Sequence, residues 1–282
     1  MKKRTPLKLT DKELRRLQLT ELEMVLEVDR ICRKNNIKYV LGYGSMLGAV
    51  RHEGFIPWDD DVDIFMLREE YEKFCDACKN ELDDSRFFLQ NWETDKFFNS
   101  GYAKMRRLNS KFMRFGQEKM QFNQGIYIDI MPMDNLPDIR KERDEFIKKC
   151  ITYRKILYSK AGSMCEKNIL KRCGYKILSL IPRDKVKMKF GKVMQTYRGQ
   201  NTCYCMCLGS LGRVPYCKEI FEERQEVNFE GFKIFIPKRP QCFLKMCYGM
   251  DYMTPPPEEE RVQKAAISYI EFPNDNPLDT FR

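Results

Sequence analysis

The pattern of apolar and polar positions predicts helices packed on a mixed set of strands. A capping box at Thr10 to Glu13 opens a long amphipathic helix that should end near Asn35. A hairpin with its turn at Glu230-Gly231 and a short helix over residues 242–248 follow late in the chain. Between them, apolar runs predict strands at residues 39–41, 64–66, 87–89, 102–108 and 125–132, and a helix at 69–82. Together these elements indicate an α+β fold of helices on a mixed sheet.

The charge pattern changes between Asp138 and Arg198. This segment has 18 Lys and Arg residues against 6 Asp and Glu, a net charge of +12, whereas the whole 282-residue chain carries +10. Its apolar residues predict basic amphipathic helices, which suit an anionic membrane surface or a polyanionic acceptor. An ordinary solvated face over a core stays open as the alternative. Nucleic acid is not expected as a partner, because the aromatic residues form no stacking pattern.

These changes along the chain divide it into three parts. We expect a catalytic core at residues 1–137, a basic helical region at 138–225 and a small C-terminal lobe at 226–282 that packs back on the core. The basic residues of the second part, Arg154 among them, are expected to lie outside the metal site.

Composition and segment lengths limit where the protein works. Hydrophobic residues make up 43% of the sequence, which supports a folded core. No apolar run approaches the ~20 residues of a membrane span, and charged residues follow Met1 where a signal peptide needs its apolar stretch. We expect a cytoplasmic protein, with peripheral contact at the inner face of the membrane as an open alternative. The twelve cysteines are expected to be reduced thiols, and the single histidine argues against a zinc site.

The stretch from Tyr39 to Met66 contains the most informative chemistry. Its sequence Gly42-Tyr43-Gly44-Ser45 precedes a helix that is expected to begin at Met46. The N-terminus of a helix presents unpaired N–H groups and a positive dipole end. Gly44 and Ser45 are therefore expected to seat a phosphate of the substrate.

Aspartates that follow this turn are candidate metal ligands. Asp61 and Asp63 should project from one face of a strand, and two like charges there are stabilised by a divalent cation. Oxygen ligands favour Mg²⁺ or Mn²⁺ over zinc. Asp129 lies inside an apolar run and is expected to be the third catalytic carboxylate, although a salt bridge to a basic neighbour would also explain its charge. Asp59 is a further candidate ligand.

Two other positions are assigned from their strands. Lys104 and Arg106 fall on one strand face, where a cation pair would suit a phosphate, and we assign Lys104 to substrate contact. Asp134 lies beyond Pro132 and is expected to be structural. A phosphate seat followed by paired carboxylates is the equipment for phosphoryl or nucleotidyl transfer.

Two segments, LGAVRH from Leu47 and GFIPWDDDVDI from Gly54, resemble the signature of the LicD family. That family comprises phosphocholine transferases of bacterial surface polysaccharides and is related to the fukutin-type phosphotransferases. The resemblance implies a nucleotidyltransferase-type fold and a CDP-linked donor such as CDP-choline. Because Arg51 lies within the signature, it is expected to contact substrate.

The end of the chain resembles the same family. The hairpin, the run at residues 248–257 and the pair Glu260-Arg261 extend the likeness to roughly residue 264, and Arg261 is expected to contact substrate. Met250 and Lys264 depart from the family pattern, and neither is expected to touch the carboxylates. The tail after Ile270 is expected to be loose.

These features lead to an expected reaction. A phospho-substituent, with phosphocholine as first choice, would pass from a CDP-linked donor to a hydroxyl of a cell-surface glycan or its lipid-linked precursor, and CMP would be released. Asp129 would complete the metal site and accept the proton of the hydroxyl. Two alternatives stay open: a nucleotidyltransferase that moves NMP to a small molecule or protein, and a non-catalytic protein that binds an anionic surface.

Overall fold

The computed structural model describes residues 5–210, 214–275 and 277–278. Its largest sheet has seven strands, in the order β1-β2-β6-β4-β3, with β7 pairing with β6 and β8 with β7. β2 and β6 are parallel and the other pairs are antiparallel, so the sheet is mixed, as predicted. The strands are β1 (Val40–Leu41), β2 (Asp63–Leu67), β3 (Phe87–Gln90), β4 (Ala103–Arg107), β6 (Tyr127–Leu136), β7 (Tyr204–Met206) and β8 (Tyr216–Cys217).

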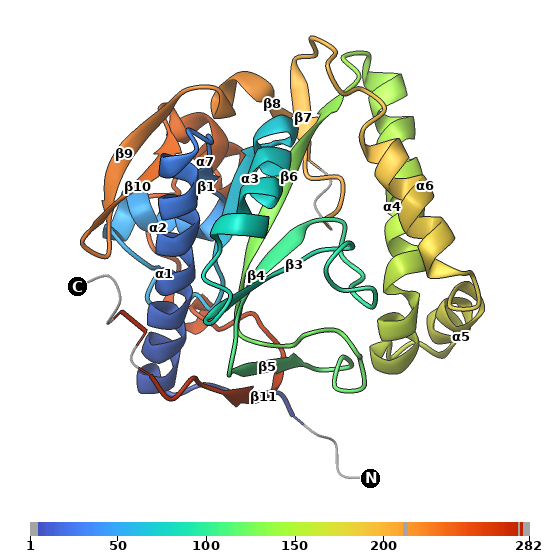
Figure 1. Ribbon diagram of the computed structural model, residues 1–282, viewed down its shortest axis with the longest axis horizontal. Coiled ribbons are helices and arrows are strands. Elements are labelled where there is room, and N and C mark those ends of the chain that lie inside the picture. The colour runs from blue at the N-terminus through green and yellow to red at the C-terminus, as the bar shows by residue number, and fades with distance from the viewer. Residues whose placement is uncertain (1–4, 211–213, 276, 279–282) are drawn as a thin grey trace.

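Two helices cover one face of this sheet (Figure 1). α1 (Asp11–Lys34) begins with the predicted capping box, and α3 (Arg68–Glu81) follows directly after β2. Ile128 and Ile130 of β6 point to this covered face and are completely buried. Asp129 lies between them and points to the opposite face, because side chains alternate along a strand.

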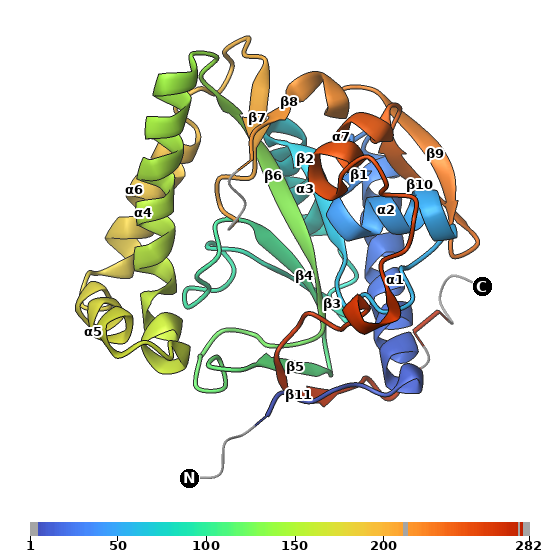
Figure 2. The ribbon, with the colours of Figure 1, turned by 180° about the vertical axis from the view of Figure 1, so that it is seen from behind.

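The opposite face carries helices at its two sides and is called the open face below (Figure 2). On one side, Phe65 of β2 packs against Tyr43 and Phe243, which belong to α2 and α7. The hairpin of β9 and β10, with its turn at the predicted Glu230-Gly231, lies beyond them. The bounds are α2 (Tyr43–His52), α7 (Pro240–Tyr248), β9 (Arg224–Phe229) and β10 (Phe232–Pro237), with short 3₁₀ turns at Lys218–Phe221 and Glu258–Glu260.

The basic region forms helices, as predicted, on the other side of the open face (Figure 2). These are α4 (Arg140–Cys165), α5 (Ile169–Leu178) and α6 (Arg183–Met194). α4, α6 and β7 share a small core of their own, which includes Phe146 and Phe190. No helix in the described ranges combines the length and the apolarity needed to cross a membrane.

Two element boundaries differ from the prediction by three residues or more. α2 begins at Tyr43 instead of Met46, so the glycine turn is the first turn of the helix. β6 continues through Pro132, which the apolar pattern had placed at its end. Pro132 is tolerated because the pairing with β4 ends at Ile130 and the pairing with β7 starts at Asp134, so the edge between them needs no N–H donor.

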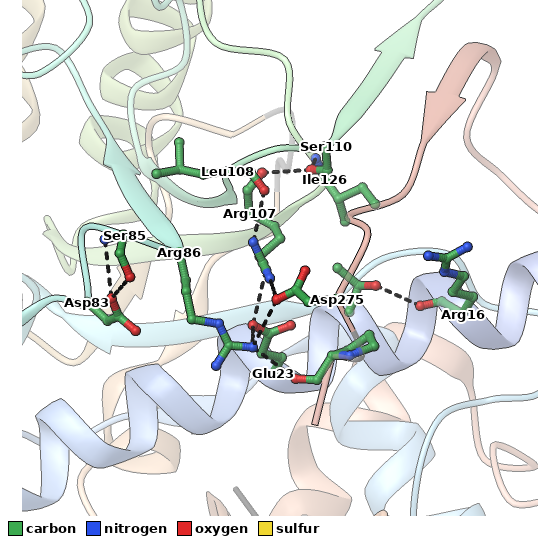
Figure 3. Close-up of polar contacts among 12 residues, drawn as sticks. Arg16, Glu23, Asp83, Ser85, Arg86, Arg107, Leu108, Ser110, Ile126 and Asp275 are labelled. Carbon is green, nitrogen blue, oxygen red and sulfur yellow. Dashed lines mark hydrogen bonds and ion pairs between the residues drawn. The ribbon is translucent and has the colours of Figure 1, made fainter. Parts of the chain in front are cut away.

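The expectation of a loose tail after Ile270 is wrong for the residues that the structure describes. β11 (Ile267–Glu271) pairs with β5 (Lys111–Arg114), and neither strand was predicted. Beyond β11, the carboxylate of Asp275 contacts Arg107 of β4, whose Nε donates to buried Glu23 of α1 (Figure 3). Arg86 also contacts Glu23, at 2.5 Å. Because these contacts join residues far apart in sequence, no local sequence pattern could predict them.

Candidate functional site

Three charged side chains form a row across the open face. Asp63 of β2 is aligned with Asp129 of β6, and Asp129 is aligned with Lys104 of β4. Residues aligned in this way point to the same face of a sheet, so the strand register itself creates the row. The structure thus brings together three residues that the sequence had assigned to the site.

Two neighbouring side chains hold Asp129: Lys104 of β4 and Tyr102, the residue directly before β4. The Lys104 ammonium group contacts Oδ1 of Asp129, and the Tyr102 hydroxyl donates to Oδ2 at 3.2 Å. The same ammonium group lies 3.5 Å from the centre of the Tyr127 ring. Burial lowers the pKa of Lys104 to about 8, although the negative charge of Asp129 raises it in part. The salt bridge that the sequence left open is therefore present.

A cluster of carboxylates lies directly before β2. Asp59, Asp60 and Asp61 each bring a carboxylate oxygen to within 4.8 Å of the others; we call these three residues the acidic cluster. Asp59 and Asp60 are buried, whereas Asp61 is exposed. Burial and the charge of Asp61 raise the pKa of Asp59 to about 7. Burial, Asp61 and Asp129 raise the pKa of Asp63 well above its usual value.

Glu21 of α1 adds a carboxylate that was not predicted from the sequence. It is 2% exposed, and its Oε2 has no hydrogen-bond partner among the described residues. Burial, followed by the charges of the acidic cluster, raises its pKa well above the usual value. A signal did exist: Glu21 lies four residues after Leu17 and four before Val25, inside the apolar stripe of the helix.

These carboxylates fit a magnesium or manganese ion. The donor set is all oxygen, and Oδ1 of Asp60, like Oε2 of Glu21, is buried without a partner in the described part of the chain. The oxygens of the acidic cluster lie close enough to one another to hold one ion. Asp60, which the sequence prediction did not include, therefore joins Asp59 and Asp61 as a candidate ligand.

The first turn of α2 touches the acidic cluster. A Cβ atom on Gly44 would lie 2.4 Å from Oδ2 of Asp59, so glycine is needed for the approach of this carboxylate. Ser45 is buried, and its Oγ accepts the backbone N–H of Asp63 at 3.0 Å. These contacts fix β2 and the acidic cluster relative to α2, and a phosphate at Gly44 and Ser45 stays a prediction.

Two predicted substrate contacts meet at one tryptophan. The guanidinium groups of Arg51 and Arg261 lie 6.0 and 5.1 Å from the centre of the Trp58 ring. Arg51 is also fixed by donating to the carbonyl of Tyr252 at 2.9 Å. The fold thus places two cations from distant parts of the sequence beside the residue that precedes the acidic cluster.

The C-terminal segment lies over the acidic cluster. Lys264 Nζ is 4.0 Å from Oδ1 of Asp59, and the N–H of Ala265 donates to Oδ2 of Asp60 at 2.9 Å. The expectation that Lys264 stays away from the carboxylates is therefore wrong. More than 200 residues separate these partners in sequence, so only the closed fold reveals the contact.

A basic pocket of about 300 Å³ lies beside Lys104. We use this name for the cavity whose cationic lining residues are Lys104, Arg106, Arg114 and Arg154, from β4, β5 and α4. Arg154, which the sequence analysis placed outside the metal site, is only 7% exposed and lines this pocket from α4. Aromatic rings, including that of Tyr127, complete the wall. Clustered cations and aromatic rings suit a phosphate-bearing ligand.

Comparison with known proteins finds a matching family domain and several relatives. Residues 36–148 match the LicD/FKTN/FKRP nucleotidyltransferase domain. The chain is 27% identical over 277 residues to lipopolysaccharide cholinephosphotransferase LicD of Haemophilus influenzae. The aligned region covers 90% of this chain and 98% of that protein. An uncharacterized protein of Rickettsia typhi is 38% identical over 68 residues, 22% of each chain. One of Rickettsia prowazekii is 33% identical over 98 residues, 28% of this chain and 36% of that protein.

Proposed function

We propose, from the membership of residues 36–148 in the LicD/FKTN/FKRP nucleotidyltransferase domain family, that this transferase moves phosphocholine from a CDP-linked donor to a hydroxyl of a surface glycan or its lipid-linked precursor. The observation that carries the proposal is the juxtaposition on the open face. Within the described residues, Asp60 and Glu21 have buried carboxylate oxygens without a hydrogen-bond partner. Asp129, whose charge raises the pKa of Asp61 and Glu21, contacts Lys104 in the lining of a pocket that has four cations. Phosphocholine is chosen because the H. influenzae relative is named for cholinephosphate transfer to lipopolysaccharide.

The two charged regions suit the two parts of a nucleoside diphosphate donor. The basic pocket would take the nucleotide phosphate through Lys104 and the neighbouring arginines. The acidic cluster would hold Mg²⁺ or Mn²⁺, with Asp63 and Glu21 at its border. A bound ion of this kind neutralises diphosphate charge and polarises the phosphorus–oxygen bond. Arg51 and Arg261 are assigned to substrate contact on the other side of the cluster.

The proposed transfer forms one phosphorus–oxygen bond and breaks another. The acceptor hydroxyl oxygen bonds to the phosphorus of phosphocholine, and the bond from that phosphorus to the bridging oxygen breaks. CMP leaves with the electron pair, while Asp129 accepts the hydroxyl proton. Protonation neutralises Asp129 as negative charge grows on CMP. Lys104 then exchanges one anionic partner for another without losing its own charge.

The test is a set of CDP-linked donors incubated with the purified chain, Mg²⁺ and a glycan acceptor, with CMP and modified glycan as readouts. Asp61→Asn should reduce turnover about a thousandfold or more, because it removes a charged ligand of the metal ion that neutralises the diphosphate. Asp76→Asn is the matched control, since Asp76 is exposed on α3 and forms an ion pair with Lys79, its one salt-bridge partner among the described residues.

Two results would overturn the proposal. Retention of more than about a tenth of the activity in Asp61→Asn would remove this residue from the metal site. Release of diphosphate from a nucleoside triphosphate, with NMP appearing on the acceptor, would favour the nucleotidyltransferase alternative.

A further inference from the structure

The outward side of α5 presents apolar side chains to solvent. Ile169, Leu170 and Ile177 are 66%, 83% and 68% exposed, and Leu180, just after the helix, is 80% exposed. At about 100° per residue, the three helical positions fall within one third of the helix circumference. We call these four residues the α5 patch. Large apolar residues gathered in this way on a surface mark an interaction site more often than a chance exposure.

The orientation of α5 is fixed by its opposite side. The ring of Tyr175 packs so closely on α4 that a Cβ atom on Gly162 would lie 2.7 Å from it. Tyr175 also makes an edge contact with Tyr158, with ring centres 5.8 Å apart. The helix is capped by the Asn168 side chain, which accepts the N–H of Lys171. An amphipathic helix normally turns its apolar side inward, whereas α5 is held with that side outward.

The surroundings of the patch are basic. Between Asn168 and Arg183 the sequence contains Lys171, Arg172, Lys176 and Arg183 and no acidic residue. α5 lies at an outer corner of the molecule, away from the large sheet, in both views (Figures 1 and 2). An apolar helix face bordered by cations is the pattern of a helix that lies in the headgroup region of an anionic bilayer.

We propose that the α5 patch inserts into the surface of an anionic membrane and anchors the protein there peripherally. A second copy of the chain is the less suitable occupant, because it carries the same net charge of +10 and the basic borders would repel each other. An anionic bilayer supplies both the negative charge and the apolar layer. The inference rests on this surface alone and holds whatever group the active site transfers.

The test uses the full chain with vesicles of phosphatidylglycerol and phosphatidylcholine, and with phosphatidylcholine alone. Wild-type protein should co-sediment with the anionic vesicles, and less so as salt rises. Leu170→Gln combined with Leu180→Gln should weaken binding on the order of tenfold or more, because two exposed apolar groups no longer enter the bilayer. The control is Leu7→Gln with Met246→Gln, two residues 44% and 50% exposed elsewhere, which should change nothing.

A second readout reports insertion directly. Ile177→Trp places an indole on the patch, and its fluorescence should shift to shorter wavelength when anionic vesicles are added. Equal vesicle binding by the Leu170/Leu180 double variant and wild type, or no binding by wild type, would overturn the proposal. Dimerisation that disappears in the double variant, without vesicle binding, would assign the patch to a second copy instead.

Discussion

Gly44→Ala is the sharpest test of how the first turn of α2 supports the acidic cluster. A Cβ atom there would lie 2.4 Å from Oδ2 of Asp59, whereas real Cβ contacts are essentially never below 3.0 Å. The two groups must therefore separate by at least 0.6 Å, the difference between these values. α2 cannot easily retreat as a body, because a Cβ on Gly48 would already lie 2.4 Å from the carbonyl oxygen of Gly54. The carboxylate of Asp59 is the group expected to move.

The size of the effect follows from this displacement. A shift of 0.6 Å exceeds the tolerance of about 0.2 Å in metal–ligand distances. A misplacement of about 1 Å can cost roughly a hundredfold in rate. We therefore expect Gly44→Ala to lower kcat by about ten- to a hundredfold and to raise the Mg²⁺ concentration needed for half-maximal activity. Stability should be unchanged or higher by up to about 1 kcal/mol, because alanine favours a helix over glycine.

The assay measures CMP release against Mg²⁺ concentration, together with thermal unfolding of the same samples. Gly191→Ala in α6 is the matched control, since the nearest atom to its new Cβ is in Trp92 at an ordinary 3.8 Å. It should leave kcat and the Mg²⁺ dependence unchanged. If Gly44→Ala keeps kcat within about threefold of wild type, Asp59 has no role that depends on its present position.

Three further predictions concern charged groups. Lys104, with a pKa of about 8, loses its charge as pH rises, so kcat/KM for the donor should fall above about pH 8. Lys104→Arg should remove this decline. If the variant keeps the pH profile of the wild type, Lys104 does not contact the phosphate. Glu21 has a raised pKa, so without metal the folded protein loses stability as pH rises above the usual glutamate value of 4.5. Glu21→Gln should therefore raise the unfolding temperature near pH 8 in EDTA but not in Mg²⁺, and equal temperatures in EDTA would contradict the buried unpaired carboxylate. Asp134→Asn should lower the free energy of unfolding by about 3–5 kcal/mol, because Arg68 would keep a buried charge without its partner. Arg68 now donates to both carboxylate oxygens of Asp134, at 2.6 and 2.9 Å. Urea unfolding measures the change, and a loss below about 1 kcal/mol would show that solvent reaches Arg68.

The sequence by itself determined the elements whose signals are local. The capping box at Thr10 fixes the start of α1, because it satisfies backbone groups within one turn. The Glu230-Gly231 turn fixes the hairpin, since both residues adopt positive φ there. The resemblance of the segments from Leu47 and Gly54 identified the family that the comparison of residues 36–148 supports. All of these signals span a few adjacent residues.

Strand alternation also carried part of the site. Asp129 lies between Ile128 and Ile130, so its side chain had to leave the apolar face whatever the rest of the fold became. The sequence could not say what would meet it. The register of β4 against β6 decided that its neighbour is Lys104, and the pairing of strands is a property of the assembled sheet.

Only the tertiary structure decided which distant residues complete the site. Glu21, Arg154 and Lys264 come from α1, α4 and the C-terminal segment, and each reaches the open face or the acidic cluster only after the chain has closed. A charged side chain has no spacing rule that reveals a partner 200 residues away. Its position is set by the packing of the helix or segment that carries it, and this packing depends on the whole hydrophobic core.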